Sequence, residues 1–433
     1  IDECHKRGIA VIIDMVFNHT TGQNPMAELY PYGNDLKYNP WYNPTGSIPH
    51  KDKEFEPDWN HDFGPTKTMF TRCFQYWLNE YKVDGFRLDL SHGLCGTTDD
   101  DVEHLQDYYN KGVKAVSSDA YMILEHWDNG ASTLINAGML CWDNTSNAYC
   151  QTAMGWLKDG DSFGNANRDG YVSYCESHDE ERSFFKAKQW GNGDLQTNEA
   201  ARVARVPLNM AFLTLLNGPQ MFYHFAELGF DDSKFMNKDS KWGKNDYGIT
   251  SELGADYDAK TQVKKRVEHW MTEGNIHMSA FQKVGQMIQL RTRLMPEVFE
   301  GNPTAATLGS GKALRTIQWG SNVFVAGNFD VAGEQTVTLP SGTWYNYFAQ
   351  AKQTTTTVTL KPGEVAIFTG KEVKLPEMPA GYDFYTDVED VVINTPSEML
   401  PPYNVRVYNI NGQLISSQMN AMSADLTGMK AGL

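Results

Sequence analysis

Short apolar runs alternate with helix-like stretches over roughly the first 290 residues, and this alternation constrains the fold most strongly. Residues 9–13 read Ile-Ala-Val-Ile-Ile and follow a charged, helix-like stretch. A short run that is apolar on both faces and is preceded by a helix is typical of a buried parallel strand. The same pattern recurs at residues 83–90, 121–125, 138–142, 171–175 and 220–223. Alternation of this kind predicts an α/β fold with a parallel sheet.

The leading form of this fold is a TIM (β/α)8 barrel whose first two strands are missing from the sequence. A doubly wound open sheet is the alternative, but no GxGxxG motif supports it. We assign residues 1–300 to the barrel, from about its third strand to its eighth helix, with a short inserted domain at 20–67.

The pattern of apolar and polar residues changes near residue 300. Short alternating runs separated by Gly, Pro or Asn predict an all-β sandwich domain at 301–370. Residues 371–400 are poorly periodic and contain Pro and Glu, so we predict a linker there. In the remaining stretch, 401–433, two alternating runs flank Asn411-Gly412, which is a strong signal for a small β-hairpin.

The charge balance limits the classes of partner. The 433 residues include 37 Lys and Arg against 54 Asp and Glu, a formal net charge of −17. This surplus argues against nucleic acid or an anionic membrane as the main partner. No apolar run approaches the roughly 20 residues that cross a bilayer. The six cysteines form no CxxC pair. We therefore expect buried free thiols, or one or two disulfides if the chain is secreted.

Polar side chains suited to chemistry stand where the predicted strands end, which is where a parallel barrel carries its functional groups. These positions hold three carboxylates, two histidines and one arginine: Asp89, Glu125, Asp179, His19, His178 and Arg87. Taken singly, each has an ordinary explanation as a helix cap, a turn residue or an ion pair. Their joint occurrence at successive strand ends predicts one functional rim.

The spacing and surroundings of two of these carboxylates indicate different roles. Arg87 and Asp89 are two apart on a strand, so we expect both to point into the barrel. A guanidinium lowers the pKa of a neighbouring carboxyl group and keeps it ionised, as a nucleophile requires. Glu125 instead ends an apolar strand, and apolar surroundings raise a carboxyl pKa so that the group holds a proton. Two carboxyl groups tuned apart in this way suit glycosidic cleavage.

Four segments resemble the signature regions of the α-amylase family, glycoside hydrolase family thirteen. They are residues 14–19 (Asp-Met-Val-Phe-Asn-His), 85–89 (Gly-Phe-Arg-Leu-Asp), Glu125 and 177–179 (Ser-His-Asp). The resemblance extends from residue 1 to about 370, because the predicted β-sandwich is similar to domain C of that family.

The resemblance implies a role for each residue of the rim. Asp89 is expected to be the nucleophile, Glu125 the general acid/base and Asp179 the stabiliser of the transition state. Three further side chains are expected to bind the sugar at the point of cleavage, namely Arg87, His19 and His178. The resemblance also implies that Asp14 holds the end of the barrel together.

We therefore predict a retaining glycoside hydrolase that cleaves α-glucosidic bonds in starch- or glycogen-like glucans. Residues 177–180 read Ser-His-Asp-Glu, where α-amylases commonly have Asn-His-Asp. Glucan branching enzymes have a similar Ser-His-Asp-Glu motif, so a branching enzyme or another glucanotransferase is the first alternative. A non-catalytic surface protein that binds glycans is the second, and a metal-dependent hydrolase that uses His19 and His178 is a distant third.

A possible metal ligand and several aromatic residues are the remaining parts of the expected site. No cofactor is required for the chemistry, but the resemblance implies that Asn18 helps to hold a structural Ca²⁺, which prefers oxygen ligands. The oxygen-rich stretch 159–169 is interpreted as an ordinary solvated loop. Aromatic faces pack on sugar rings. The aromatic residues expected to contact substrate are Trp127 at the rim and Trp41, Tyr42 and Trp59 in the insertion.

The last residues carry a second resemblance. Residues 403–413 and 425–433 resemble the C-terminal sorting domain of the Bacteroidetes type IX secretion system, and we expect 401–433 to be a truncated copy that lacks its last few residues. This resemblance implies export by that machinery and a secreted or cell-surface location. A small β domain that packs against the protein or binds glycan is the alternative.

Overall fold

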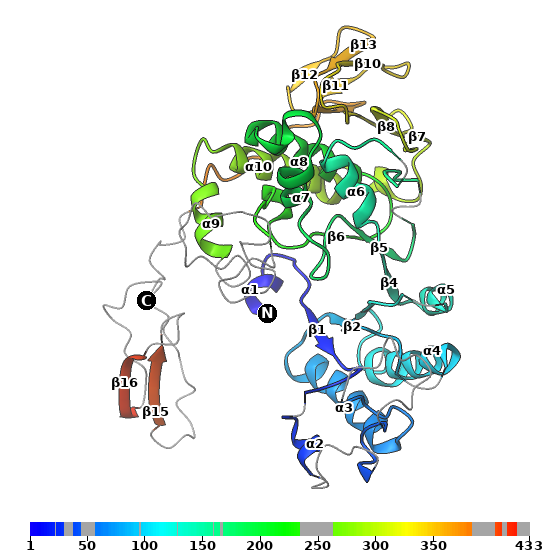
Figure 1. Ribbon diagram of the computed structural model, residues 1–433, viewed down its shortest axis with the longest axis vertical. Helices are drawn as coiled ribbons and strands as arrows, with labels where there is room; N and C mark the ends of the chain where they lie inside the picture. Colours follow the sequence, from blue (N-terminus) through cyan, green and yellow to red (C-terminus); the bar gives the residue numbers. More distant parts are fainter. Residues whose placement is uncertain are drawn as a thin grey trace.

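The computed structural model describes residues 1–21, 23–29, 38–44, 57–94, 97–127, 129–158, 160–164, 168–233 and 263–382, together with the backbone of two strands at 403–408 and 414–421. The first part is an α/β unit, and the second part is built of antiparallel strands (Figure 1).

Six strands of the first part form one parallel sheet in the order β1-β2-β3-β4-β5-β6. They are β1 (Ile12–Val16), β2 (Gly85–Asp89), β3 (Tyr121–Leu124), β4 (Leu140–Asp143), β5 (Tyr171–Tyr174) and β6 (Gln220–Met221). Each predicted run overlaps one strand, so the parallel sheet is confirmed. The first strand is shifted to 12–16 relative to its predicted run at 9–13, because Asp14, Met15 and Val16 continue the parallel register with β2. Pairing of every strand with its successor is the connectivity of a (β/α)8 barrel.

Helices and helical turns connect these strands. They are α1 (Asp2–His5), α2 (Pro25–Glu28), α3 (Gly64–Glu80), α4 (Thr98–Asp107), η3 (Tyr108–Lys114), α5 (Ala131–Asn136), α6 (Ser146–Ala153), α7 (Ser183–Trp190), η4 (Gly193–Gln196), α8 (Glu199–Thr214), η5 (Ala226–Leu228), α9 (Val263–Trp270), α10 (Ile276–Gln289), η6 (Leu290–Leu294) and η7 (Pro296–Phe299).

Helix α3 illustrates how the sequence fixes the strands beneath. Its buried side chains Phe70, Phe74 and Leu78 recur every four residues, so they line one face of the helix. The ring of Phe74 meets Phe86 of β2 edge-on, with the ring centroids 4.9 Å apart. Phe86 and Leu88 are fully buried in the core on this side of the sheet. The alternate residues of β2 are thereby directed to the opposite face, as the spacing of Arg87 and Asp89 predicts.

The second part contains two antiparallel sheets. Its strands are β7 (Ala305–Thr307), β8 (Leu314–Trp319), β9 (Val323–Asn328), β10 (Gln335–Thr338), β11 (Tyr345–Asn346), β12 (Ala351–Lys352), β13 (Thr357–Leu360) and β14 (Val365–Thr369). Six of them form a sheet in the order β12-β11-β14-β9-β8-β7, while β10 pairs with β13. Phe324 and Phe368 of the large sheet share a core with Val337 and Leu360 of the small one. The two sheets therefore lie face to face.

The α/β unit and the large antiparallel sheet share a continuous core, which joins residues of α8 and α10 to Ile317, Val325 and Ile367. A fully buried ion pair reinforces this junction. Nη2 of Arg315 on β8 lies 2.5 Å from Oδ2 of Asp161, which belongs to the α/β unit. Asp161 lies in the stretch predicted to be a solvated loop, and that interpretation is wrong at this residue because its carboxylate is completely buried. Asp159, Asn165 and Asn167 lie outside the described residues.

The chain then returns along α10. The side chains of Gln282 and Gln286 donate to the carbonyl oxygens of Pro379 and Pro376. The start of the predicted linker is thus held against the α/β unit. Farther on, β15 (Tyr403–Tyr408) and β16 (Leu414–Ala421) pair as an antiparallel hairpin, which confirms the hairpin prediction.

Two other sequence expectations bear on the described residues. Cys4, Cys73, Cys141, Cys150 and Cys175 are all free thiols, and Cys95 lies outside the described residues. Within the described part of the chain, no helix combines the length and the apolar character needed to span a bilayer.

Candidate active site

The strand register brings the predicted carboxylates together. Leu88 of β2 pairs with Leu124 of β3, and the amide of Glu125 donates to the carbonyl of Leu88. Continuing this register by one residue places Asp89 beside Glu125 at the carboxyl ends of the two strands. The interatomic distances agree. One carboxylate oxygen of Asp89, one of Glu125 and one ring nitrogen of His178 all lie within 4.8 Å of one another.

Arg87 stands at the centre of this group. Its Nη1 donates to Oδ1 of Asp14 at 2.9 Å and to Oδ1 of Asp89 at 2.5 Å, while Nη2 donates to Oε2 of Glu125 at 2.6 Å. One guanidinium therefore fixes carboxylates from three successive strands. This arrangement confirms the expectation that Arg87 and Asp89 point to the same side of β2.

The environments of Asp89 and Glu125 shift their pKa values in opposite directions. The hydrogen bond from His178 and the charge and hydrogen bond of Arg87 lower the pKa of Asp89, and they outweigh the opposing effect of burial. Burial raises the pKa of Glu125, although the charge of Arg87 and the amide of Leu90 oppose the rise. At neutral pH Asp89 is an ionised carboxylate, and Glu125 is the group better able to hold a proton.

His178 and Asp179 follow β5 and approach the same place. Nε2 of His178 lies 3.4 Å from Oδ1 of Asp89 and 3.5 Å from Oδ1 of Asp179. The hydrogen bond to Asp89 raises the pKa of His178. The side chain of Asp179 is 68% exposed, so it can reach a molecule bound at the rim.

The loop that carries these two residues is held from both ends. Ser177 donates to Glu180 and accepts from the amide of Asp179, and Glu180 also accepts from the hydroxyl of Tyr174. Beneath the loop, Glu176 and Arg182 form a buried ion pair at 3.0 Å. The segment Ser-His-Asp-Glu therefore forms a braced turn in which the serine hydroxyl has a structural use.

In the sequence, His19 precedes Asp89 and Trp127 follows Glu125. Burial lowers the pKa of His19, and the negative charge of Asp89 opposes that shift. Nε1 of Trp127 donates to Oε1 of Glu125 at 3.3 Å, while 38% of the Trp127 residue is exposed. Trp127 thus contacts the candidate acid and keeps part of its surface exposed, so its predicted contact with substrate stays a prediction.

The aromatic residues of the insertion are placed differently. Tyr42 and Trp59 are only 2% and 4% exposed, and their rings stack on each other with centroids 4.5 Å apart. The prediction that these two residues contact substrate is wrong because both are buried in the same core as Phe70 of α3. Trp41 packs edge-on against Trp59 and Phe63 and lines a surface groove beside α3.

The residues around Asn18 do not fit a calcium ion. Nδ2 of the buried Asn18 donates directly to the carbonyl oxygens of His92 and Gly93, at 2.7 and 3.2 Å, and Oδ1 lies 3.2 Å from Nδ1 of His19. Ca²⁺ takes six to eight oxygen ligands, whereas among the described residues the amide nitrogen of Asn18 itself contacts the two carbonyl oxygens, and Oδ1 is turned toward His19. In this arrangement Asn18 joins the end of β1 to the loop after β2, and the proposed reaction uses no metal ion at this position.

In the described part of the chain, one group of three His, Cys, Asp or Glu side chains has possible metal-ligand atoms close together, all within 4.8 Å of one another, and it consists of Asp89, Glu125 and His178. The Arg87 guanidinium donates to both of its carboxylates. A divalent cation placed among them would be repelled by this charge. The cluster is therefore better suited to proton and glycosyl chemistry than to metal binding.

Trp142 of β4 is a site residue that the sequence interpretation did not identify. Its ring centroid lies 4.2 Å from Cζ of Arg87 and 5.9 Å from the ring centroid of His178. Trp142 closes the run predicted at 138–142. Applying the strand-end rule to aromatic as well as polar residues would have found it.

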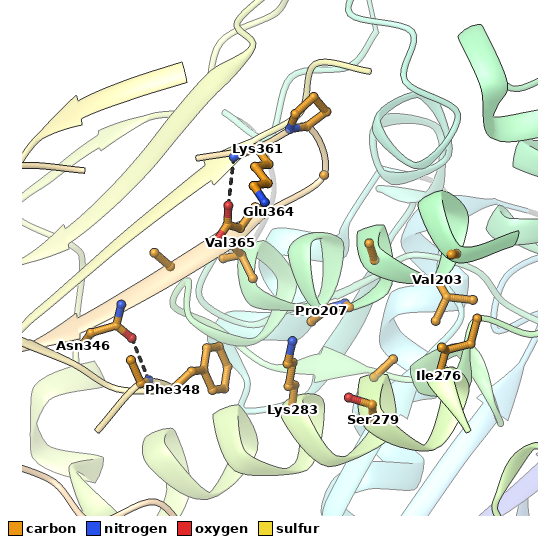
Figure 2. Close-up of a pocket in the computed structure, with 17 residues that line it drawn as sticks. Val203, Pro207, Ile276, Ser279, Lys283, Asn346, Phe348, Lys361, Glu364 and Val365 are labelled. Atoms are coloured by element: carbon orange, nitrogen blue, oxygen red, sulfur yellow. Dashed lines mark hydrogen bonds between the residues drawn. The ribbon is translucent and has the colours of Figure 1, made fainter. Parts of the chain in front are cut away.

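A separate pocket lies away from these residues. This pocket has a volume of about 730 Å³ and is lined by residues of α8, α10 and the antiparallel strands. Lys283, Phe348 and Glu364 are among its lining residues (Figure 2). None of the candidate site residues lines it. Its position does not alter the assignment of the site to the strand ends.

No protein-family model matches the chain. It is 30% identical over 141 residues to a cyclomaltodextrinase of a Bacillus species, which covers 29% of this chain and 24% of the relative. It is 31% identical over 143 residues to a maltogenic α-amylase of Bacillus acidopullulyticus, covering 29% and 22%. The chain therefore spans about a quarter of the length of these curated relatives.

Solved structures are similar over most of the chain. An α-amylase from Geobacillus thermoleovorans complexed with acarbose has a TM-score of 0.58 and 18% identity, covering 85% of this chain and 78% of that one. A pullulanase from a species of Anoxybacillus complexed with maltotriose has a TM-score of 0.61 and 16% identity, covering 85% and 54%. These relatives and structural neighbours are enzymes of the α-amylase family. The structural likeness shows that this chain shares their fold.

Proposed function

We propose that this protein is a retaining glycosidase that cleaves α-glucosidic bonds in starch- or glycogen-like glucans. The observation that carries the proposal is the pairing of Asp89 with Glu125. One carboxylate oxygen of Asp89 lies within 4.8 Å of one of Glu125, and the pKa values of the two groups are shifted in opposite directions. Retaining glycosidases have carboxyl groups about 5–5.5 Å apart, whereas inverting enzymes need a wider gap for a water molecule.

In the first step, protonated Glu125 donates its proton to the glycosidic oxygen as the bond to the anomeric carbon breaks. Ionised Asp89 attacks that carbon from the opposite face and forms a β-glycosyl ester. In the second step, Glu125, now a carboxylate, removes a proton from water as the water oxygen attacks the anomeric carbon. Asp89 leaves as a carboxylate, and the product regains the α configuration.

The neighbouring side chains support these steps. Arg87 keeps Asp89 ionised, and the hydrogen bond from His178 acts in the same direction. The exposed Asp179 can bind sugar hydroxyl groups and stabilise the positive charge that develops in the oxocarbenium-like transition state. Trp127 offers an aromatic face beside the acid.

The test is the anomeric form of the first product, followed by proton NMR during digestion of maltooligosaccharides. Retention predicts that the α anomer appears first and then mutarotates. Asp89→Asn is expected to abolish turnover, whereas Asp143→Asn is the matched control because Asp143 also ends a strand but pairs with Arg168. Initial release of the β anomer, or substantial turnover by Asp89→Asn, would overturn the proposal.

Two rival functions are distinguished by their products. A glucanotransferase would change the iodine stain and the branching of amylose with little release of reducing ends. A glycan-binding protein would bind amylose without any turnover. The opposed pKa shifts of Asp89 and Glu125 favour a hydrolytic enzyme over a binding protein, because binding alone needs no proton donor.

We also propose that the chain is exported through its C-terminal segment. Support comes from the resemblance of residues 403–413 and 425–433 to a type IX sorting domain and from the hairpin formed by β15 and β16. Fusing residues 401–433 to a reporter protein in a Bacteroidetes host tests the proposal. Surface display or release that depends on the segment supports it, and retention of the fusion in the periplasm contradicts it.

A further inference from the structure

The ring of Trp142 packs against the guanidinium of Arg87, whose hydrogen bonding is incomplete. Nη1 and Nη2 of Arg87 serve three carboxylates, but the buried Nε has no hydrogen-bond partner among the described residues. A buried charged donor without a partner is costly. The face of the Trp142 ring lies 4.2 Å from the guanidinium carbon, which is well within the range of a cation–π contact.

Strand register explains why Trp142 stands there. Leu124 of β3 pairs with Cys141 of β4, so the next residues along the two strands, Glu125 and Trp142, are neighbours. Trp142 is only 6% exposed and packs in a cluster with Val172 and Tyr174 of β5. Its side chain is therefore held in place beside the carboxylates by close packing, which leaves it little freedom to change rotamer.

The same indole contacts the other partner of the nucleophile. The rings of Trp142 and His178 meet edge-on at 65°, with centroids 5.9 Å apart. Trp142 also contacts the ring of Trp127, which donates a hydrogen bond to Glu125. Trp142 thus contacts three side chains that themselves contact Asp89 or Glu125, namely Arg87, His178 and Trp127.

From this geometry we propose that Trp142 is a positioning residue, which holds the guanidinium of Arg87 and the ring of His178 in the places that orient Asp89 and Glu125 for reaction. This inference rests on the proposed glycosidase function. Trp142 is buried behind the reacting groups, so it acts through Arg87 and His178. The role depends on an aromatic face and not merely on apolar bulk.

A series of substitutions separates the aromatic contribution from bulk. Trp142→Leu removes the cation–π contact, while Trp142→Phe keeps a weaker one. On amylose, we expect Trp142→Leu to lower kcat about 10- to 30-fold with KM changed less than about threefold, and Trp142→Phe to lower kcat by only about threefold. Trp344→Phe is the control, because Trp344 is equally buried but lies in the core between the antiparallel sheets.

The pH profile supplies a readout that a general loss of stability would not change. If Arg87 shifts away, the acid limb and the basic limb of kcat/KM both move to higher pH. Charged and titratable groups that face this cluster come from β1, β2 and β5 and from the segments that follow β1, β3 and β5: Asp14, His19, Arg87, Asp89, Glu125, Tyr174, His178, Asp179 and Glu180. Unchanged limbs in Trp142→Leu, or equal losses in the Leu and Phe variants, would overturn the inference.

Crystal structures of the wild type, Trp142→Phe and Trp142→Leu provide a test that needs no turnover. We expect Arg87 to bridge Asp89 and Glu125 in the wild type and the Phe variant but to leave that position in the Leu variant. If Arg87 stays in place in all three, the inference fails even when the protein is a glycosidase. If the wild type digests no α-glucan, the proposed function fails, and the displacement of Arg87 still decides the positioning role. Should Trp142→Leu not fold, Trp142→Met takes its place with the same expectations.

Discussion

Replacing Asp161 with Asn should weaken the junction between the α/β unit and the antiparallel sheets. Both Asp161 and Arg315 are completely buried, with the charged atoms 2.5 Å apart. Removing one partner of a buried ion pair typically costs about 3–5 kcal/mol because the other charge is left uncompensated. Here Nη1 of Arg315 keeps the backbone carbonyl of Asp161, and the guanidinium keeps the rings of Phe163 and Phe329. We therefore expect a loss near the lower end, about 3 kcal/mol.

Urea unfolding followed by tryptophan fluorescence measures this loss. Asp143→Asn is the matched control, since its partner Arg168 is half exposed and such pairs contribute at most about 1 kcal/mol. The double variant Asp161→Leu/Arg315→Met removes both charges, so it should be more stable than Asp161→Asn. The reasoning is refuted if Asp161→Asn unfolds at the same urea concentration as Asp143→Asn, or if the double variant is the least stable of the three.

Three further predictions concern the site and its support. Glycosidase activity should fall as the pH rises through the raised pKa of Glu125, and it should persist at low pH because the pKa of Asp89 is lowered. Arg87→Met should move both limbs of the kcat/KM profile to higher pH, since Arg87 lowers both pKa values. Limbs that stay in place would contradict this. Trp127→Phe should reduce kcat/KM on amylose about tenfold through loss of the hydrogen bond to Glu125, and an unchanged value would exclude that contact from function. Phe74→Ala should destabilise the protein by about 3–5 kcal/mol in urea unfolding, because Phe74 is fully buried between α3 and β2; a loss below about 1 kcal/mol would show that the core there can collapse.

The sequence was sufficient to predict the parallel sheet and the rim because both follow from periodicity. Apolar runs between helices located all six strands, and the strand-end rule selected Asp89, Glu125 and His178, which the structure brings within 4.8 Å. The two-residue spacing of Arg87 and Asp89 predicted their shared orientation, which the 2.5 Å hydrogen bond confirms.

Long-range burial accounts for what the sequence did not reveal. Tyr42 and Trp59 sit in a polar segment, so nothing local distinguishes a stacked core pair from a sugar-binding pair. Asp161 sits in an oxygen-rich stretch, and its partner Arg315 is 154 residues away. Trp142 ends an apolar run, and an aromatic residue at a strand end carries no polar signal that would mark it as a site residue. Its contact with Arg87 depends on the register between β3 and β4.

Trapping of the glycosyl-enzyme tests the central claim most directly. Glu125→Gln cannot supply the base for the second step, and an α-maltosyl fluoride needs little acid assistance in the first, so the covalent intermediate should accumulate. Mass spectrometry of the digested protein is expected to show one maltosyl group on the peptide that contains Asp89, and none in Asp89→Asn/Glu125→Gln. Consumption of the fluoride without an adduct, or an adduct on another residue, would contradict the assignment of Asp89 as the nucleophile.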